Sequence, residues 1–106
     1  MKKLARGLEG IEEGTAYGSP ALKVGGSMFA CMAIHKSAEP GTLVVCMSLT
    51  ERDLRMQYDP DTYYLKPHYE GGPCVLVRLS RIGDDELRDV LEVGWHFVRD
   101  QRKRRK

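Results

Sequence analysis

Apolar residues near the start of the chain recur at helical spacing. Leu4, Leu8 and Ile11 lie three or four residues apart, which is the spacing of one face of an amphipathic helix. Two glycines interrupt this stretch, and each costs about 1 kcal/mol relative to alanine inside a helix. The pattern predicts a short first helix over residues 4–13.

Short apolar runs bounded by turn residues come next. The runs 21–24 and 28–34 flank Gly25-Gly26-Ser27, and a Gly-Gly pair supplies the positive φ angles of a tight hairpin turn. A turn at Glu39-Pro40-Gly41 precedes TLVVCM, residues 42–47, which is apolar on both sides and suits the centre of a sheet. The pattern therefore predicts three consecutive strands.

A second helix is predicted by its capping residues. Thr50 is a suitable N-cap, and Leu49 and Leu54 occupy the two positions of a hydrophobic staple around it. We expect this helix to end near Tyr58, because Asp59-Pro60-Asp61 does not continue a helix.

The last part of the chain predicts a hairpin and a long helix. Residues 62–65 and 74–79 are rich in tyrosine, valine and leucine, with a turn at 69–73 between them. The final helix is expected to start near Asp84, and Gly94 is expected to mark its closest approach to the sheet. Its apolar face consists of Leu87, Val90, Leu91, Gly94, Trp95 and Val98.

The order helix, three strands, helix, two strands, helix predicts an α+β fold. Strands joined by tight turns pair antiparallel, so we expect one antiparallel sheet of about five strands with helices mainly on one face. The 106-residue length predicts one domain, residues 1–100, followed by a basic tail, residues 101–106, which we expect to be disordered.

Composition and charge narrow the function classes. The chain is 42% hydrophobic and 30% charged, and it shows neither a membrane-spanning apolar run nor a secretory signal, which favours a cytoplasmic protein. Residues 1–100 carry 12 Lys or Arg against 15 Asp or Glu, whereas QRKRRK at the end adds five positive charges and no acid. The basic character therefore lies almost entirely in the tail.

Few residues indicate chemistry. Cys31, Cys46 and Cys74 lie 15 and 28 residues apart inside apolar runs, which favours three core thiols over a disulfide or a metal site. Glu12 and Glu13, as neighbours on a helix, would diverge by about 100° and could not act on one substrate as an acid and base pair. His35, His68 and His96 show no metal-ligand spacing, and no serine lies in a nucleophile motif. We expect no catalytic residue, no metal and no cofactor.

Several motifs carry a resemblance to a known family. EEGTAYGSPALKVGG (residues 12–26), the strand SMFACM, the segment DPDTYYLKPHYEGGPCVLVRL and the closing helix DELRDVLEVGWHFV resemble the MmcQ/YjbR family of small bacterial proteins. The resemblance covers residues 4–98. It implies a CyaY-like α+β fold and DNA binding through a double-wing arrangement, and it implies no established catalytic activity. On this interpretation EEGTAYGSPALKVGG is a structural connection between elements and not an active-site loop.

Candidate contacts to nucleic acid follow from the hairpins and the tail. Lys66, His68 and Tyr69 combine aromatic and basic groups near a loop, where they could stack bases and neutralise phosphates. Lys23 and Arg78 are the basic residues of the two hairpins that would act as wings. The tail candidates are Arg102, Lys103, Arg104 and Arg105, followed by Lys106. Each of these groups also has a purely structural or solubilising interpretation.

Two other functions remain open. One is a protein-interaction module whose open sheet face or edge receives a partner segment. The other is a small-ligand pocket rimmed by Tyr17, His68 or Tyr69. The leading hypothesis is a non-enzymatic domain that binds DNA weakly and in a salt-sensitive way.

Overall fold

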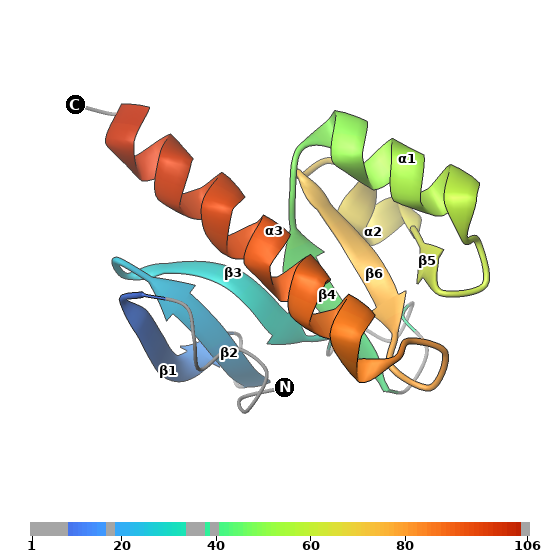
Figure 1. Cartoon of the computed structure of the whole chain (residues 1–106), viewed down its shortest axis with the longest axis horizontal. Coiled ribbons are helices and arrows are strands. Elements are labelled where there is room, and N and C mark those ends of the chain that lie inside the picture. Colours follow the sequence, from blue (N-terminus) through green and yellow to red (C-terminus); the bar gives the residue numbers. More distant parts are fainter. Residues whose placement is uncertain (1–8, 17–18, 34–37, 39–40, 105–106) are drawn as a thin grey trace.

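One antiparallel sheet and its helices make up the described part of the chain. The computed structural model describes residues 9–16, 19–33, 38 and 41–104 (Figure 1). In this part of the chain the strands are β1 (Ile11–Ala16), β2 (Ser19–Val24), β3 (Ser27–Met32), β4 (Thr42–Cys46), β5 (Tyr63–Tyr64) and β6 (Cys74–Arg78). The helices are α1 (Leu49–Tyr58), α2 (Pro67–Glu70) and α3 (Asp84–Arg104). The predicted α+β class with one antiparallel sheet is confirmed, whereas the element order and the number of strands differ from the prediction.

The sheet runs in the order β1-β2-β3-β4-β6-β5, and every neighbouring pair is antiparallel. Strand β6 therefore lies between β4 and β5, and the two central strands are β3 and β4. Helix α3 crosses one face of this sheet diagonally (Figure 1), in contact with β2, β3 and β4. The main core lies between α3 and that face, which we call the helix face.

The predicted first helix, residues 4–13, is wrong in its second half. Residues 1–8 lie outside the described part of the chain, but Ile11–Ala16 form strand β1, paired with β2 from Ile11 opposite Val24 onward. Gly10 has a φ of +73°, in the left-handed region that a helix does not use. The helical spacing of the leucines and Ile11 was overridden by pairing with a strand eight residues further on.

The predicted hairpin around Gly25 and Gly26 is confirmed, and β3 contains an irregularity that the sequence did not indicate. Both glycines have positive φ, at 57° and 82°. The register then shifts, because Leu22 lies opposite Ala30 whereas Lys23 lies opposite Met28. Phe29 is the extra residue of this β-bulge, and both Phe29 and Ala30 are fully buried in the core of the helix face. A bulge lets two successive residues turn to the same side.

Helix α1 starts two residues earlier than predicted. Its N-cap is Ser48, whose Oγ accepts a hydrogen bond from the Glu51 backbone N–H at 3.2 Å. Thr50 is therefore inside the helix and does not cap it. Leu49 and Leu54 are 53% and 56% exposed, so the predicted staple is not formed. The predicted end at Tyr58 is confirmed.

The second hairpin is also present, with a longer connection than expected. Tyr63 and Tyr64 pair with Val77 and Leu76, and the four-residue helix α2 interrupts the loop between the strands. Pro67 starts α2, where its missing N–H and fixed φ are tolerated.

Helix α3 follows its prediction closely. All six positions of the predicted apolar face are buried, and a Cβ atom added to Gly94 would come within 3.0 Å of the Cys46 carbonyl oxygen and 3.2 Å of that of Phe29. The helix continues to Arg104, so residues 101–104, expected as part of a disordered tail, extend α3. No helix in the described residues has the length and apolar character needed to cross a membrane.

The opposite face of the sheet is apolar as well. Ala21, Cys31, Val44, Tyr64 and Leu76 are buried there, and Tyr69 of α2 packs against them. This face therefore does not offer an open docking surface at these residues.

Candidate nucleic-acid interface

Two loops and the end of a helix meet at one end of the sheet. The loops are the β2–β3 turn and the segment between α2 and β6, and the helix end is the last turns of α3. A cleft of about 200 Å³ lies among them, and its lining includes Ser27 after the turn, Pro73 before β6 and Gln101 of α3. We call this region the hairpin end of the domain. It brings together both predicted wings and the start of the predicted tail.

The C-terminal turns of α3 carry basic residues to the hairpin end. Positions 99–104 contain four Lys or Arg and one Asp, and they continue the helix beyond Val98, the last residue of the buried face. The N-terminal half of α3 is acidic instead, with Asp84, Asp85 and Glu86 in its first turn. Charges of opposite sign therefore lie at the two ends of α3.

Lys23 lies on the face away from α3 and is part of the β2–β3 wing. Its side chain crosses Gly14 of β1, since a Cβ added to that glycine would lie 3.6 Å from Lys23 Cε. The facing residue is Glu12, whose carboxylate accepts a hydrogen bond from the Gly26 N–H at 3.0 Å. Glu12 thus holds the tip of the wing. The hydrogen bond between Glu12 and Gly26 gives EEGTAYGSPALKVGG a structural role, and the sequence did not indicate this contact.

Lys66 and Arg78 lie together against Tyr64. The guanidinium of Arg78 is 4.1 Å from the centre of the Tyr64 ring, and the ammonium of Lys66 is 6.0 Å from it. Arg78 also donates to the carbonyl oxygens of Pro60 and Asp61, at 3.2 and 2.9 Å. Arg78 is therefore engaged in holding the α1–β5 connection, and it lies at the end of β6 away from the hairpin end.

The remaining candidate residues differ in where they lie. Tyr69 is half-buried and packs against the sheet, so its ring serves the core. His68 lies in α2, and Arg102, Lys103 and Arg104 lie in the last turn of α3. Arg105 and Lys106, together with Tyr17 and His35, lie outside the described residues.

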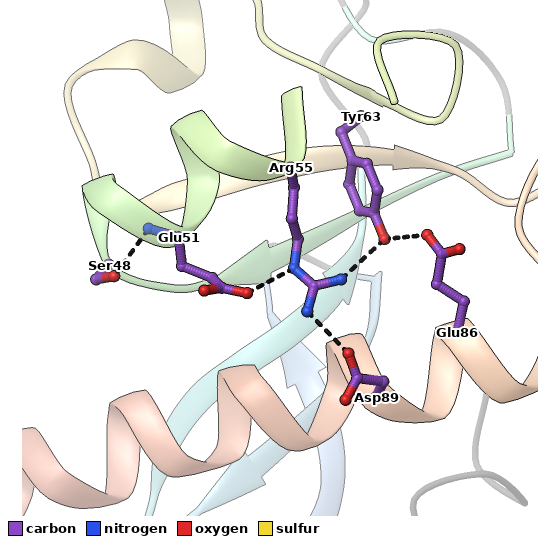
Figure 2. Close-up of polar contacts among 6 residues, drawn as sticks. All are labelled: Ser48, Glu51, Arg55, Tyr63, Glu86 and Asp89. Carbon is purple, nitrogen blue, oxygen red and sulfur yellow. Dashed lines mark hydrogen bonds and ion pairs between the residues drawn. The ribbon is translucent and has the colours of Figure 1, made fainter. Parts of the chain in front are cut away.

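A polar network missed by the sequence interpretation joins α1, β5 and α3 (Figure 2). Arg55 donates to Glu51 at 2.9 Å, to the Tyr63 hydroxyl at 3.1 Å and to Asp89 at 2.9 Å. The Tyr63 hydroxyl donates in turn to Glu86 at 2.5 Å. Figure 2 shows the guanidinium of Arg55 pointing from α1 into the space above α3. The four-residue spacing of Glu51 and Arg55 is present in the sequence, whereas the contacts of Arg55 to β5 and α3 depend on the tertiary fold.

This network has the properties of a structural clamp. Burial raises the pKa of Tyr63, and its hydrogen bond to Glu86 adds to that effect. Burial disfavours the charge on Arg55, but the hydrogen bonds to Asp89 and Tyr63 outweigh it and raise the pKa of the guanidinium. Both groups thus keep their protons. Among the described residues every buried side-chain nitrogen or oxygen has a hydrogen-bond partner.

The three cysteines are present as thiols. Cys31 is buried, and Cys46 and Cys74 are half-buried. Burial raises the pKa of all three, that of Cys46 to about 12, so they are protonated near neutral pH. In the part of the chain that the structure describes, no three His, Cys, Asp or Glu residues are placed to hold a metal ion.

The cleft at the hairpin end is smaller than a usual ligand pocket. Its volume of about 200 Å³ lies below the roughly 300–1,000 Å³ of small-molecule sites. Its lining also differs from the predicted rim of Tyr17, His68 or Tyr69. It consists of Ser27, Met28, Cys46, Pro73, Phe97, Val98 and Gln101.

Comparison of the chain with protein-family models, with curated proteins and with solved structures gives no match.

Proposed function

We propose that this chain is a non-enzymatic domain that binds nucleic acid through its hairpin end. The observation that carries the proposal is the meeting of both hairpin connections with the basic C-terminal turns of α3, around the cleft lined by Ser27, Pro73 and Gln101. Phosphate contacts need several positive groups on one surface, and they need no pocket. The resemblance to MmcQ/YjbR proteins, which are predicted to bind DNA through two wings, supports the same surface.

The composition of this surface defines the kind of binding. Lys23, on the face away from α3, and Lys66, beside Tyr64, supply the contribution of the two hairpins. Residues 99–104 at the end of α3 supply the larger part of the positive charge. Arg78 is not included, because its guanidinium is already bonded to two carbonyl oxygens. Each contacted phosphate contributes about −0.9 to the slope of log K against log salt, so four contacts give roughly −3.6. The binding is therefore weak near physiological salt and shows little base preference.

The test compares charge removal from the two hairpins with charge removal elsewhere in the domain. A double variant, Lys23→Gln with Lys66→Gln, removes one positive charge from each of the two hairpins. Its matched control, Arg81→Gln with Arg88→Gln, removes two exposed charges near the acidic start of α3. Binding to a short DNA duplex is measured by fluorescence anisotropy between about 50 and 200 mM salt.

We expect the Lys23→Gln, Lys66→Gln variant to bind several-fold more weakly with a shallower salt slope, and the control to bind like the wild type. Replacing Arg102, Lys103 and Arg104 with Gln should have a larger effect. Equal losses in the double variant and its control would show attraction by overall charge alone and would contradict the proposal. No binding of the wild type at low salt would also contradict it.

A second candidate function, protein docking, is favoured by the exposed surface of α1. This helix has no buried residue, and Leu54 and Tyr58, one turn apart, are 56% and 88% exposed. The inner side of α1 carries Arg52 and Arg55, at 12% and 15% exposed, and Met56, which packs against the core. Exposed large apolar side chains close together are typical of interaction surfaces.

Docking on α1 is tested by capture from nuclease-treated cell extract. A partner that binds Leu54 and Tyr58 should be captured by the wild type and by Leu49→Ser, whose leucine is exposed outside that pair. It should be lost with Leu54→Ser and Tyr58→Ser combined. Capture that is unchanged by the double variant would reject this function.

A further inference from the structure

Two of the cysteines face each other across neighbouring strands. Cys46 at the end of β4 is directly opposite Cys74 at the start of β6. The next pair along, Met47 and Pro73, is joined by a backbone hydrogen bond at 3.0 Å. Hydrogen-bonded and non-hydrogen-bonded pairs alternate in an antiparallel ladder, so the two cysteines form a non-hydrogen-bonded pair.

That type of pair has the spacing that a disulfide requires. Its Cα atoms lie about 4.5 Å apart, and a disulfide spans Cα separations of about 4.4–6.8 Å. The Cβ atoms of facing residues are about 4.5–5.5 Å apart, and closest in this type of pair. A disulfide needs about 3.5–4.5 Å, so an approach of about 1 Å or less is sufficient.

In the thiol form the two side chains are turned apart. Cys46 Sγ donates toward the Met28 carbonyl oxygen of β3 at 3.6 Å, and Cys74 Sγ donates toward the Tyr69 carbonyl oxygen of α2 at 3.5 Å. Thiols are weak donors, so a rotation about each Cα–Cβ bond breaks only weak contacts. The same rotation brings the two sulfur atoms toward each other.

Access and charge distinguish this pair from the third thiol. Cys46 lines the open cleft at the hairpin end, beside Phe97. Cys74 is half-buried, and the positive charge of Arg52 offsets part of the rise in its pKa that burial causes. Cys31 is buried and lies opposite Val44 in the ladder. The more reactive thiol of the pair is therefore Cys74, with Cys46 placed to react next.

We propose that Cys46 and Cys74 are a redox-active pair that closes to a cross-strand disulfide by exchange with a small-molecule disulfide such as oxidised glutathione. The Cys74 thiolate attacks one sulfur of glutathione disulfide, which forms a mixed disulfide and releases one reduced glutathione. The Cys46 thiolate then attacks the Cys74 sulfur and releases the second glutathione. In total, two protein thiols become one disulfide and glutathione disulfide becomes two thiols. This inference does not depend on nucleic-acid binding.

The test incubates the native full-length chain with oxidised glutathione and follows mass and linkage. Four proteins are compared: the wild type, Cys31→Ser, Cys46→Ser and Cys74→Ser. Non-reducing peptide mapping identifies the joined cysteines. A parallel reaction in denaturant, followed by the same mapping, provides the reference in which all three thiols can pair.

The wild type and Cys31→Ser are expected to lose two hydrogens and to contain a single link, Cys46 to Cys74. Cys46→Ser should retain one glutathione on Cys74, because the resolving thiol is missing. Cys74→Ser should react several-fold more slowly than Cys46→Ser. The rate for the wild type should rise about tenfold per pH unit between about pH 7 and 9, since the thiolate is the attacking species.

Three results would overturn the proposal. One is a native link that includes Cys31. Another is a mixture of links that matches the denatured reference, which would mean that the strand register does not select the pair. The last is an unmodified native chain under conditions in which the denatured chain forms disulfides. Circular dichroism of each serine variant checks that its outcome is measured on folded protein.

Discussion

Gly94 of α3 lies so close to Val45 of β4 that a Cβ atom added to the glycine would come within 2.9 Å of Val45 Cγ1. The Val45 side chain can move slightly, but the carbonyl oxygens of Cys46 and Phe29, at 3.0 and 3.2 Å, belong to the backbone of the central sheet. The absence of a side chain at position 94 therefore sets how near the helix can approach.

Gly94→Ala is expected to destabilise the protein. Alanine is favoured over glycine in a helix by about 1 kcal/mol. Overpacking of a core typically costs about 1–3 kcal/mol. The upper part of that range applies here, because the backbone carbonyl groups near Gly94 cannot move aside as a side chain can. The net loss in the free energy of unfolding is expected to be about 1–2 kcal/mol, measured by urea denaturation. Gly71→Ala is the control, because a Cβ there would meet nothing within 4 Å. A stabilised Gly94→Ala protein would show that α3 can shift away from the sheet.

Arg78→Gln is expected to affect stability more than nucleic-acid binding. Loss of the stacking on Tyr64 and of the hydrogen bonds to Pro60 and Asp61 should lower the free energy of unfolding by about 1–2 kcal/mol. Thermal denaturation measures this, with the exposed Arg88→Gln as control. The slope of DNA binding against salt should change by less than one phosphate contact. If the variant instead loses one phosphate contact from the salt slope and keeps the wild-type stability, Arg78 belongs to the binding surface.

Tyr63→Phe tests the clamp between α1 and α3. The ring is buried, so phenylalanine keeps the packing and removes only the hydroxyl that joins Arg55 to Glu86. We expect a loss of about 1–2 kcal/mol in the free energy of unfolding. Tyr58→Phe is the same chemical change on a side chain that is 88% exposed and should have no measurable effect. Equal stability of the two variants would mean that the clamp contributes nothing.

The thiol of Cys46 predicts sensitivity to alkaline pH. Burial raises its pKa from 9.0 to about 12, so the unfolded chain releases this proton at a lower pH than the folded chain does. The stabilisation is complete below about pH 9 and is lost as the pH rises toward 12, at up to about 1.4 kcal/mol per pH unit for one group. Urea denaturation between pH 8 and pH 11 should show a steeper decline for the wild type than for Cys46→Ala. Parallel declines would assign the sensitivity to other groups.

Local sequence patterns were sufficient to predict the elements whose conformation depends on residues close together in the sequence. Gly25-Gly26 between two apolar runs predicted the β2–β3 hairpin, and the three- and four-residue spacing from Leu87 to Val98 predicted the buried face of α3. In contrast, strand β1 exists because it pairs with β2, and the helical spacing of the preceding residues gave the opposite prediction. Ser48 and Thr50 are both good caps, so the choice between them depends on where β4 ends.

The candidate site was predictable in its residue types and not in their arrangement. Lys23, Lys66 and the basic residues at the end of the chain were identified from their charge and from their places in the expected hairpins and tail, and their contact with nucleic acid stays a prediction. The engagement of Arg78 with the α1–β5 connection and the facing of Cys46 and Cys74 required the strand order β4-β6-β5. The spacing of residues within one helix or strand does not predict the order of the strands in the sheet.

Charges of opposite sign occupy the two halves of α3, acidic from Asp84 to Glu92 and basic from Arg99 to Arg104. The helix has 21 residues, so at about 1.5 Å per residue these charges are separated along roughly 30 Å. Such a separation gives the molecule a large permanent dipole moment. In the field of any strongly anionic surface the domain would rotate before contact, so that the C-terminal end of α3 arrives first, and productive encounters would become more frequent without any added contact.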